Sequence, residues 1–351
     1  MKKDFHYCAI RVIAEKAGFS PEEAQIIAFA SQYVDDAVEY EKIKVKNLPP
    51  DIKYERRKGE IFDPTCTAHK GFQYIVAMEK DSQLKIYIPF HFIPAQKYDG
   101  SGVFDYVVYP NCHLAWQLVD DSLKLLEDSN KDSRTRHLIK LGIALHSYAD
   151  TWAHQNFSGR RSSKDNDIEK VRLIKNGKET KLDLLNRITG IIPDIGHSEA
   201  FNYPDESHLK WNYIKDFTGE KIKRDNTEIF LQASEAIYTL LVNFNDLPSQ
   251  WNTLKVNLEK CYKLPHRNYE DNKRKYDTVF PEIKKNHFKY HEDEWRQEAL
   301  SGGSIEFSNF SKGDYIKQVY TCKDDLKWFY FHWEAFNQRK FIVNSIKKDL
   351  L

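Results

Sequence analysis

The segment 145–159, LHSYADTWAHQNFSG, constrains the fold of this chain more than any other. It lies in a helix that the apolar periodicity predicts over about 134–157, and it places His146, Asp150 and His154 four residues apart. At about 100° per residue, these three side chains fall within about 80° of one another on the helix surface. The apolar side chains of the same face are Ile139, Ile143, Ala149 and Ala153. The helix therefore directs three polar groups into the side that it has to bury.

A buried, ionised carboxylate costs free energy unless a partner balances its charge. A metal ion would balance Asp150 and use both flanking histidines, because imidazole nitrogen and carboxylate oxygen are common ligands of zinc and related first-row divalent ions. The alternative is a buried network of hydrogen bonds between the histidines and the aspartate, without a metal. The number of ions, from one to three, stays open at this point.

A second helix repeats the pattern. Ser20, Pro21 and Glu23 predict its start, through a capping box and a proline at the first helical position. Along the stretch AQIIAFASQYVDDAV, Asp35 lies within about 20° of the centre of the apolar stripe, and Asp36 lies about 100° further round. Asp35 is therefore the expected ligand or general base, whereas Asp36 is expected to face substrate or solvent. An exposed acidic pair near the helix end is the alternative.

Further histidines are candidates because of their surroundings. His6 lies in an apolar segment, and His69 and His91 lie in loop-like or extended segments. His197 lies in a loop marked by glycine and proline, with Asp205 nearby, and such loops often carry functional residues. A lone histidine on an apolar face is more often a core residue with satisfied hydrogen bonds. Spacing alone therefore assigns none of these side chains, and His91 and Asp205 are expected at most to touch substrate.

The polar loop SGRRSSKDND follows the predicted metal-binding helix directly. Arginine guanidinium groups bind phosphate oxygens through paired hydrogen bonds. Arg160 and Arg161 are therefore candidates to meet a phosphate-bearing substrate at the mouth of the site. A surface loop without such a role is the alternative.

The remaining pattern predicts a mainly α-helical protein, a helical bundle with a small extended or β insert at residues 51–110. The insert is expected because KIYIPFHFIP and DYVVYP are rich in aromatic and β-branched residues and are interrupted by prolines. We expect a helical metal-binding core at 1–210 and a helical region at 211–351, packed together as one continuous domain. The other expected helices span 4–17, 20–40, 112–127, 227–245, 250–262 and 323–349.

Charge and cysteine content bound the partners and the compartment. The 351 residues include 53 Lys and Arg against 52 Asp and Glu, a formal net charge of +1. This balance argues against a general surface for polyanions, so nucleic acid is expected only as a substrate. The five cysteines are scattered without a CxxC pair, and no signal peptide or membrane span is visible, which together favour a cytoplasmic protein. The oligomeric state stays open.

Several strings together resemble an uncharacterised bacterial family known only as a domain of unknown function. The strings are DFHYCAI, ASQYVDDA, TAHKGF, PFHFIP, HSYADTWAHQNFSG and GHSEAFNYPD. Their order is more distantly similar to the zinc-dependent phospholipase C and single-strand nuclease superfamily, which has an N-terminal histidine, an early aspartate, a later histidine and a His-x3-Asp pair on a helix. That resemblance implies an all-helical fold that holds up to three zinc ions and hydrolyses phosphoesters.

The resemblance also implies roles for individual residues, by motif order alone. His146 and Asp150 match the His-x3-Asp pair, and Asp35 matches the early aspartate. The other implied metal ligands are His6, His69 as the middle histidine, His154 and His197.

Two departures from the superfamily stand beside this match. A His-x3-Glu pair is missing, because the residue four positions after His197 is Phe201. The superfamily also binds zinc through a free N-terminus, whereas here five residues precede His6.

From these observations we expect a metal-dependent hydrolase, by preference a phosphoesterase acting on a small-molecule or other phosphoester substrate. Asp35 and Asp150 are the candidate catalytic carboxylates. One alternative is a metal-dependent amidohydrolase or an HD-like nucleotide hydrolase. Another is a non-enzymatic helical binding protein with a structural metal. A closed site with four protein ligands would favour the structural role, and an open site would favour catalysis.

Overall fold

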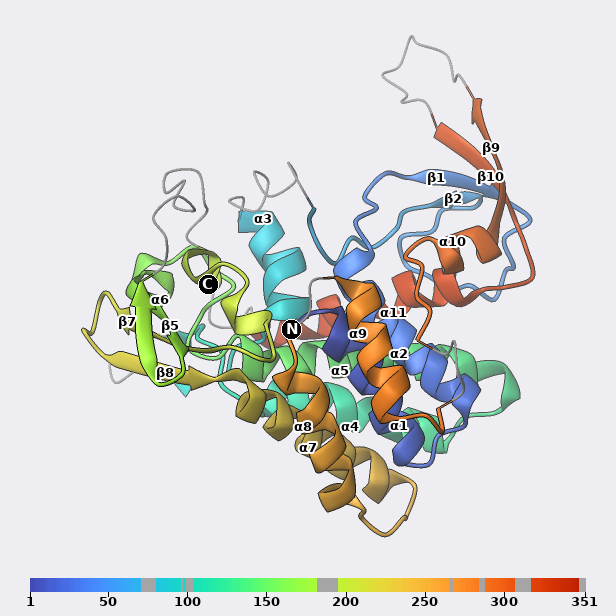
Figure 1. Ribbon diagram of the computed structural model, residues 1–351. Helices are drawn as coiled ribbons and strands as arrows, with labels where there is room; N and C mark the ends of the chain where they lie inside the picture. The colour runs from blue at the N-terminus through green and yellow to red at the C-terminus, as the bar shows by residue number, and fades with distance from the viewer. Residues whose placement is uncertain are drawn as a thin grey trace.

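The computed structural model describes residues 1–70, 80–95, 97–98, 104–181, 195–265, 268–283, 288–306 and 317–346. Its centre is the long helix α5 (Lys131–Ala153), which is buried over almost its whole second half. Four longer helices pack against α5 (Figure 1), namely α2 (Pro21–Asp36), α4 (His113–Glu127), α7 (Asn226–Phe244) and α11 (Lys327–Ile346).

Shorter elements complete the described chain. The remaining helices are η1 (Asp4–Ala9), α1 (Ile10–Lys16), α3 (Lys80–Ser82), η3 (Gln83–His91), α6 (Ser163–Asn166), η5 (Ser198–Ala200), η6 (Tyr203–Asp205), α8 (Trp251–Lys263), α9 (Tyr269–Val279) and α10 (Glu294–Ala299). The strands are β1 (Ile43–Lys46), β2 (Ile61–Phe62), β3 (Lys97–Tyr98), β4 (Phe104–Asp105), β5 (Ile168–Lys175), β6 (Lys178–Lys181), β7 (Lys210–Lys215), β8 (Lys221–Asp225), β9 (Leu300–Glu306) and β10 (Lys317–Cys322). The elements η1 and η3 are π-helical, whereas η5 and η6 are 3-10 turns.

The contact between α2 and α5 is unusually close and fixes two walls of the site described below. The predicted capping box at the start of α2 is confirmed, since Ser20 Oγ accepts from the Glu23 N–H at 3.2 Å and Glu23 accepts from the Ser20 N–H at 3.0 Å. A Cβ atom at Gly142 in α5 would lie 2.4 Å from the Ile27 carbonyl oxygen of α2. Glycine at this position therefore allows the two backbones to approach each other.

Two four-stranded sheets lie at different ends of the helical region (Figure 1). One has the order β2-β1-β10-β9 and joins distant parts of the chain, because β1 pairs in parallel with β10. The other has the order β6-β5-β7-β8 and is antiparallel throughout. The mainly α-helical class predicted from the sequence is therefore wrong, and the protein is a mixed α/β fold.

The missed antiparallel sheet carried a readable signal. Asn176 and Gly177 connect β5 to β6, and both have positive φ, 50° and 74°. An Asn-Gly pair with this geometry is the preferred two-residue turn of a hairpin. This hairpin lies within residues 1–210, for which the sequence analysis predicts a helical core.

The described part of the predicted β insert at 51–110 is also only partly extended. The strands β2, β3 and β4 have two residues each, and the aromatic segment KIYIPFHF forms the π-helix η3 in place of a strand. This helix is wedged between α5 and α11 and buries Ile86, Ile88 and Phe90. Burial on more than one side has overridden the strand preference of its β-branched and aromatic residues.

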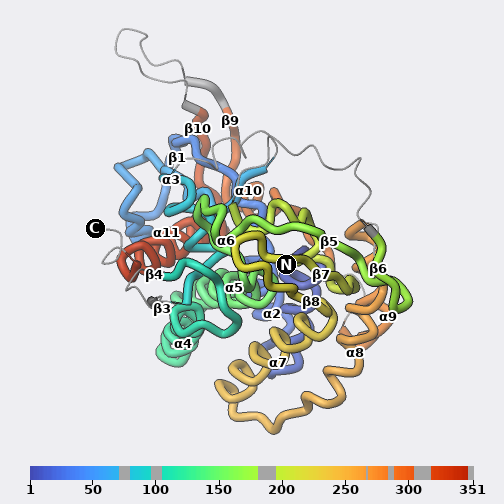
Figure 2. The backbone as a smooth tube through the Cα atoms, turned by 90° about the vertical axis from the view of Figure 1, so that its left-hand side faces the viewer, coloured from blue at the N-terminus to red at the C-terminus, as the bar shows by residue number. Residues whose placement is uncertain are grey.

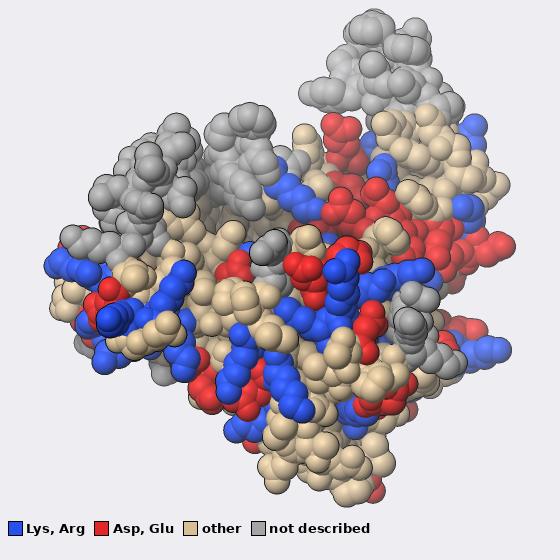
Figure 3. Space-filling model, viewed as in Figure 1, with Lys and Arg blue, Asp and Glu red and all other residues tan. Residues whose placement is uncertain are grey.

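The predicted helices of the C-terminal third are confirmed closely by α7, α8 and α11. Within the described chain, no helix is long and apolar enough to cross a membrane. All five cysteines are unpaired. Basic and acidic side chains are mixed over much of the face shown in Figure 3, and acidic side chains gather on its upper right. The N-terminus lies in the middle of the molecule beside α5 in both backbone views (Figures 1 and 2), and this position brings it into the site.

Candidate metal centre

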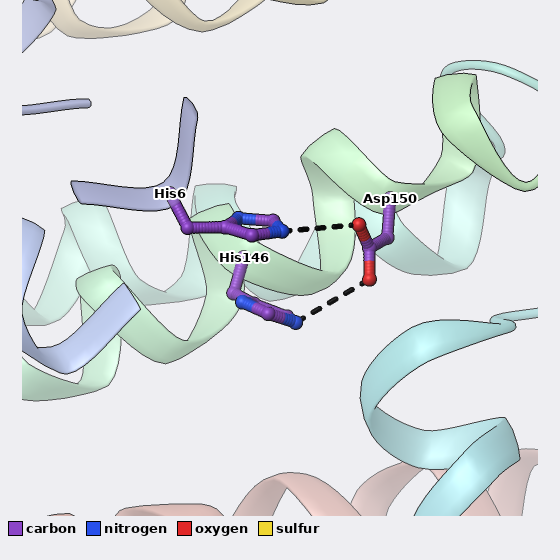
Figure 4. Close-up of side chains that lie close together, drawn as sticks. All are labelled: His6, His146 and Asp150. Carbon is purple, nitrogen blue, oxygen red and sulfur yellow. Dashed lines mark ion pairs between the residues drawn. The ribbon is translucent and has the colours of Figure 1, made fainter. Parts of the chain in front are cut away.

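The carboxylate of Asp150, near the end of α5, is the hub of the site and is 1% exposed. Its Oδ1 lies 2.5 Å from the Met1 α-amino nitrogen and 3.2 Å from Nε2 of His6. Its Oδ2 lies 3.3 Å from Nε2 of His146 and 3.3 Å from Nδ1 of His91. Figure 4 shows the rings of His6 and His146 side by side, both pointing at this carboxylate. The N-terminal segment and η3 thus converge on one side chain of α5, next to His146 of the same helix.

Three groups of histidine and aspartate side chains in the described chain are arranged so that a metal ion could be held by each. In each group the potential ligand atoms lie within 4.8 Å of one another. The first two groups share one histidine. The groups are His6, His146 and Asp150; Asp35, His91 and His146; and His154, His197 and Asp205.

The third group joins the other two through charged contacts. One oxygen of Asp205 lies 3.2 Å from Nε2 of His154, and its other oxygen lies 3.4 Å from Nε2 of His197. Nδ1 of His154 lies 3.6 Å from Asp150, and the Met1 amine lies 3.1 Å from Asp205. The three groups therefore form one continuous cluster.

Local backbone geometry presents two of the histidines. His6 lies in the π-helix η1, and His91 is the last residue of the π-helix η3. Short π-helical segments are rare and often occur at functional sites. His154 is the C-cap of α5, at φ −93° and ψ 10°. The helix therefore ends at Ala153, four residues earlier than predicted, and His154 contacts Asp205.

Backbone carbonyl groups orient four of the imidazole rings. The contacts are His146 Nδ1 to Ser31 O at 2.8 Å, His91 Nε2 to Thr67 O at 2.9 Å, His154 Nδ1 to His91 O at 2.7 Å and His197 Nδ1 to Phe201 O at 2.8 Å. A carbonyl oxygen only accepts, so these contacts assign the ring hydrogen to the contacting nitrogen. The second nitrogen of each ring faces a carboxylate, and it is an acceptor whenever the ring is neutral. At His91, the effect of burial is outweighed by Asp150 and Asp35, which raise the pKa of the ring.

Ring nitrogens and carboxylate oxygens lie closest together where the first and second groups meet. The acceptor nitrogens of His91 and His146 lie 3.2 Å apart. Both are 3.3 Å from one oxygen of Asp150, and they lie 3.9 and 3.7 Å from Oδ1 of Asp35. Lone pairs and negative charges repel one another at this range in a buried site. A cation placed among these four atoms removes the repulsion, whereas one added proton would relieve only part of it.

Burial and charge shift the acid–base properties of the cluster. Burial favours protonated Asp150, but the neighbouring His154, Met1 amine and His146 outweigh it and hold the pKa of the carboxyl well below its usual range. Burial raises the pKa of Asp35. Burial and the adjacent His146 ring lower the pKa of His6 well below its usual value. His6 is therefore neutral, and its Nδ1 finds no hydrogen-bond partner among the described residues.

A cavity of about 680 Å³ opens beside the cluster. Asp35 faces it with 31% of its side chain exposed, and the rest of the wall includes Tyr87, His154 and Asp205. His69 lines the cavity as well, but it stands outside the three groups, and its Nδ1 lies 3.4 Å from the Tyr87 hydroxyl. The second group contains His91 instead, for which the sequence predicts only a weak substrate contact.

Asp36 borders the same cavity but turns to other partners. It pairs with Lys70 at 2.7 Å and accepts from the Tyr290 hydroxyl at 2.8 Å. Lys3 lies 4.0 Å away. Asp35 is directed toward the histidines, as the helical phase predicts. The expectation that Asp36 faces solvent is wrong, because its side chain is only 6% exposed, against 31% for Asp35.

The loop arginines lie away from this cavity. The Arg160 guanidinium stacks 4.4 Å above the Tyr106 ring, and the Arg161 backbone N–H donates to Gln83. Neither residue is among those that line the cavity. The geometry therefore gives no support to a phosphate contact by Arg160 or Arg161.

Sequence reasoning gave too little weight to two members of the cluster and missed a third. Asp205, eight residues after His197, supplies the carboxylate of the third group. His91 ends an apolar segment, which made it look like part of a strand. The Met1 amine reaches Asp150 because η1 begins at Asp4, so the residues before His6 turn back toward α5.

The chain belongs to the family of unknown function DUF6765, which it matches over residues 1–346. No curated protein matches the chain, and no solved structure matches it.

Proposed function

We propose that this protein is a metal-dependent hydrolase of the phosphoesterase class, in which the three groups around α5 hold divalent cations of the zinc type. The observation that carries the proposal is the set of acceptor nitrogens of His91 and His146 facing each other and two carboxylates in a buried site. Imidazole and carboxylate together are the ligand set that zinc prefers. The carbonyl groups behind the rings supply the outer contacts that usually orient such ligands.

The chemistry follows from the chain's own groups. Divalent cations, when bound, lower the pKa of a bound water and offset negative charge on phosphoryl oxygens. Asp35, partly exposed on the cavity wall, is placed to accept a proton from that water. Asp150 is buried between the first two groups and fixes the positions of His6, His91 and His146. His69 and Tyr87, on the wall of the same cavity, are placed to bind oxygens of the substrate.

The N-terminal amine adds a donor to this set. The Met1 nitrogen lies within 3.1 Å of both Asp150 and Asp205, between the first and third groups. A neutral amine in this position would serve as a metal ligand, and binding would then release a proton. The zinc-dependent phospholipase C superfamily, which the sequence resembles, also binds zinc through an N-terminal amine.

The alternative functions differ in the role that they give to the cavity. A structural metal is normally enclosed by four protein ligands, whereas a cavity of about 680 Å³ beside the cluster leaves room for a substrate. An amide or a nucleotide could be attacked by the same groups, so the substrate panel has to include both. A phosphoester is preferred because clustered cations balance its charge.

Two measurements test the proposal together. Elemental analysis of purified protein should find at least about one zinc-type ion per chain, since even one complete group suffices to hold an ion. The protein should cleave bis(nitrophenyl) phosphate and lose this activity in chelator and in Asp150→Ala. A metal-replete protein that cleaves no phosphodiester, phosphomonoester, amide or nucleotide would sink the hydrolase and leave the structural metal.

A further inference from the structure

A second cavity, of about 390 Å³, lies behind the wall of the metal cavity. Its lining includes Arg56, Lys85, Cys66 and Arg339, and it also includes His69, which lines the metal cavity on its other side. The two cavities therefore meet at His69, while Cys66 lines only the second cavity and Ala68 only the first.

Arg339 of α11 is the unusual member of this lining. One of its N–H groups donates to the Cys66 carbonyl, and the guanidinium lies 5.7 Å above the Phe90 ring. Its Nε is buried and has no hydrogen-bond partner among the described residues. Among the described residues, no carboxylate lies within ion-pair distance of the Arg339 guanidinium. A mostly buried cation is thus left without a counter-charge.

The other cations of this cavity are already balanced. Arg56 makes a two-pronged pair with Asp63, at 3.1 Å from Nε and 2.6 Å from Nη2. Lys85 pairs with Asp81 one helical turn away. Burial and the nearby charge of Arg56 lower the pKa of Arg339 to about 10, so Arg339 still carries its charge at neutral pH. The cavity therefore has one positive charge in excess, located at Arg339.

We propose that this second cavity binds an oxyanion, a phosphate or a carboxylate, with the Arg339 guanidinium as its main contact. A planar guanidinium matches the two oxygens of such a group and is favoured over lysine at buried sites of this kind. An anion would also remove the cost of burying an unpaired charge.

The position of the cavity suggests where that anion comes from. The Cys66 carbonyl holds Arg339, and the carbonyl of the next residue, Thr67, holds His91 of the metal cluster. Adjacent residues of one segment therefore hold one residue of each site. The inference that the oxyanion is a second anionic group of the substrate rests on the proposed phosphoesterase function. Anion binding itself does not rest on it.

The binding test uses inorganic phosphate and the protein as purified. Calorimetric titration should show a component that Arg339→Gln weakens at least about tenfold and that Arg339→Lys weakens less, because lysine keeps the charge but not the paired geometry. Lys340→Gln is the matched control. It removes the same charge from the next residue of α11, whose exposed side chain pairs with Glu55. If phosphate bound only at the metal cluster, wild type and all variants would bind it equally. Equal binding by wild type and Arg339→Gln would therefore overturn the proposal.

The substrate test separates the two sources of the anion. A phosphodiester that carries an additional terminal phosphate should show a KM at least about tenfold lower than the same diester without it, and Arg339→Gln should abolish this difference. Both proteins should cleave bis(nitrophenyl) phosphate equally. If phosphate binds at Arg339 but the second phosphate gives no advantage, the cavity binds a free anion and the substrate role is wrong. If no substrate is cleaved, the titration still decides whether the anion site exists.

Arg339→Gln also removes a contact to Cys66, so folding needs its own control. Melting temperatures of the variants should agree within a few degrees. A crystal structure of the wild type soaked with arsenate gives a measurement that needs no variant. Arsenate at the Arg339 guanidinium supports the proposal, and arsenate confined to the metal cluster contradicts it.

Discussion

Two histidines in two central helices are buried completely, and they meet opposite surroundings. His146 of α5 faces carboxylates on two sides and another imidazole at 3.2 Å. His332 of α11 accepts a hydrogen bond from the Thr65 N–H at 3.1 Å and packs against the Trp328 ring at 4.4 Å. Within the described chain, no carboxylate lies within ion-pair distance of His332.

The comparison shows what distinguishes a candidate ligand from a core histidine. Burial is the same in both cases, and so is placement on an apolar helix face. The difference is the company of charged groups, which for His146 comes from Asp35 and Asp150, whereas His332 is surrounded by aromatic rings. A buried histidine becomes a candidate for function when negative charge is buried with it.

The largest effect should come from removing the central charge. Asp150→Asn keeps the shape of the side chain but removes the only carboxylate of the first group, which also lies near His91 and His154 of the other two groups. We expect metal content to fall below about 0.2 equivalents and activity to fall at least about a thousandfold, because the cluster loses its central negative charge. His332→Gln is the control, and it should leave the metal content unchanged. Equal metal loss in both variants would show that general destabilisation, and not ligation, explains the result.

Asp35 and Asp36 give a matched pair at neighbouring positions. Asp35→Asn should lower kcat at least about a hundredfold, since this carboxylate faces the histidines and the cavity. Asp36→Asn should change kcat less than about threefold and lower stability by about 1 kcal/mol, through weaker contacts to Lys70 and Tyr290. Kinetics with bis(nitrophenyl) phosphate and thermal melting measure both effects. The reversed ranking would place the proton acceptor at Asp36.

The pH dependence of stability should report on the apolar surroundings of His332. Burial lowers the pKa of His332 to about 3, below the value near 6.5 expected in the unfolded chain. The unfolded state then binds the extra proton first, so the stability from neutral His332 is complete above about pH 6.5 and is lost as pH falls toward 3. At pH 5 the loss is about 2 kcal/mol. Urea melts of wild type and His332→Gln between pH 7 and 4.5 should differ by this slope, and parallel curves would contradict it.

A packing change tests how far the cluster depends on α2. Gly142→Ala should cost about 1–3 kcal/mol, since the new methyl group meets the Ile27 carbonyl and forces α2 away. The Ser31 carbonyl and Asp35 then move away from His146, so metal affinity should fall about tenfold. Gly177→Ala is the control. It strains a positive φ in the β5–β6 turn, and it should lower stability without changing metal affinity.

The sequence alone determined the part of this site that lies within one helix. The four-residue spacing of His146, Asp150 and His154 follows from helical periodicity, and the phase of Asp35 against Asp36 follows from it as well. Both are local properties of one helix, so their prediction does not depend on the predicted structure of the rest of the chain. The same locality explains why the helices α2, α7, α8 and α11 were predicted well, whereas a composition rich in aromatic residues gave a strand at η3.

Only the tertiary structure decided which distant side chains complete the cluster. His6, His91, Asp205 and the Met1 amine come from three separate segments, and no spacing rule relates them to α5. Their convergence depends on two π-helical segments, on a glycine contact between α2 and α5, and on a C-cap that turns His154 toward Asp205. Motif order suggested His69 where the fold places His91, because both are histidines in irregular segments. The sequence also predicted too little β structure, since strand pairing joins segments far apart in the chain and is stabilised only when the partner strand is present.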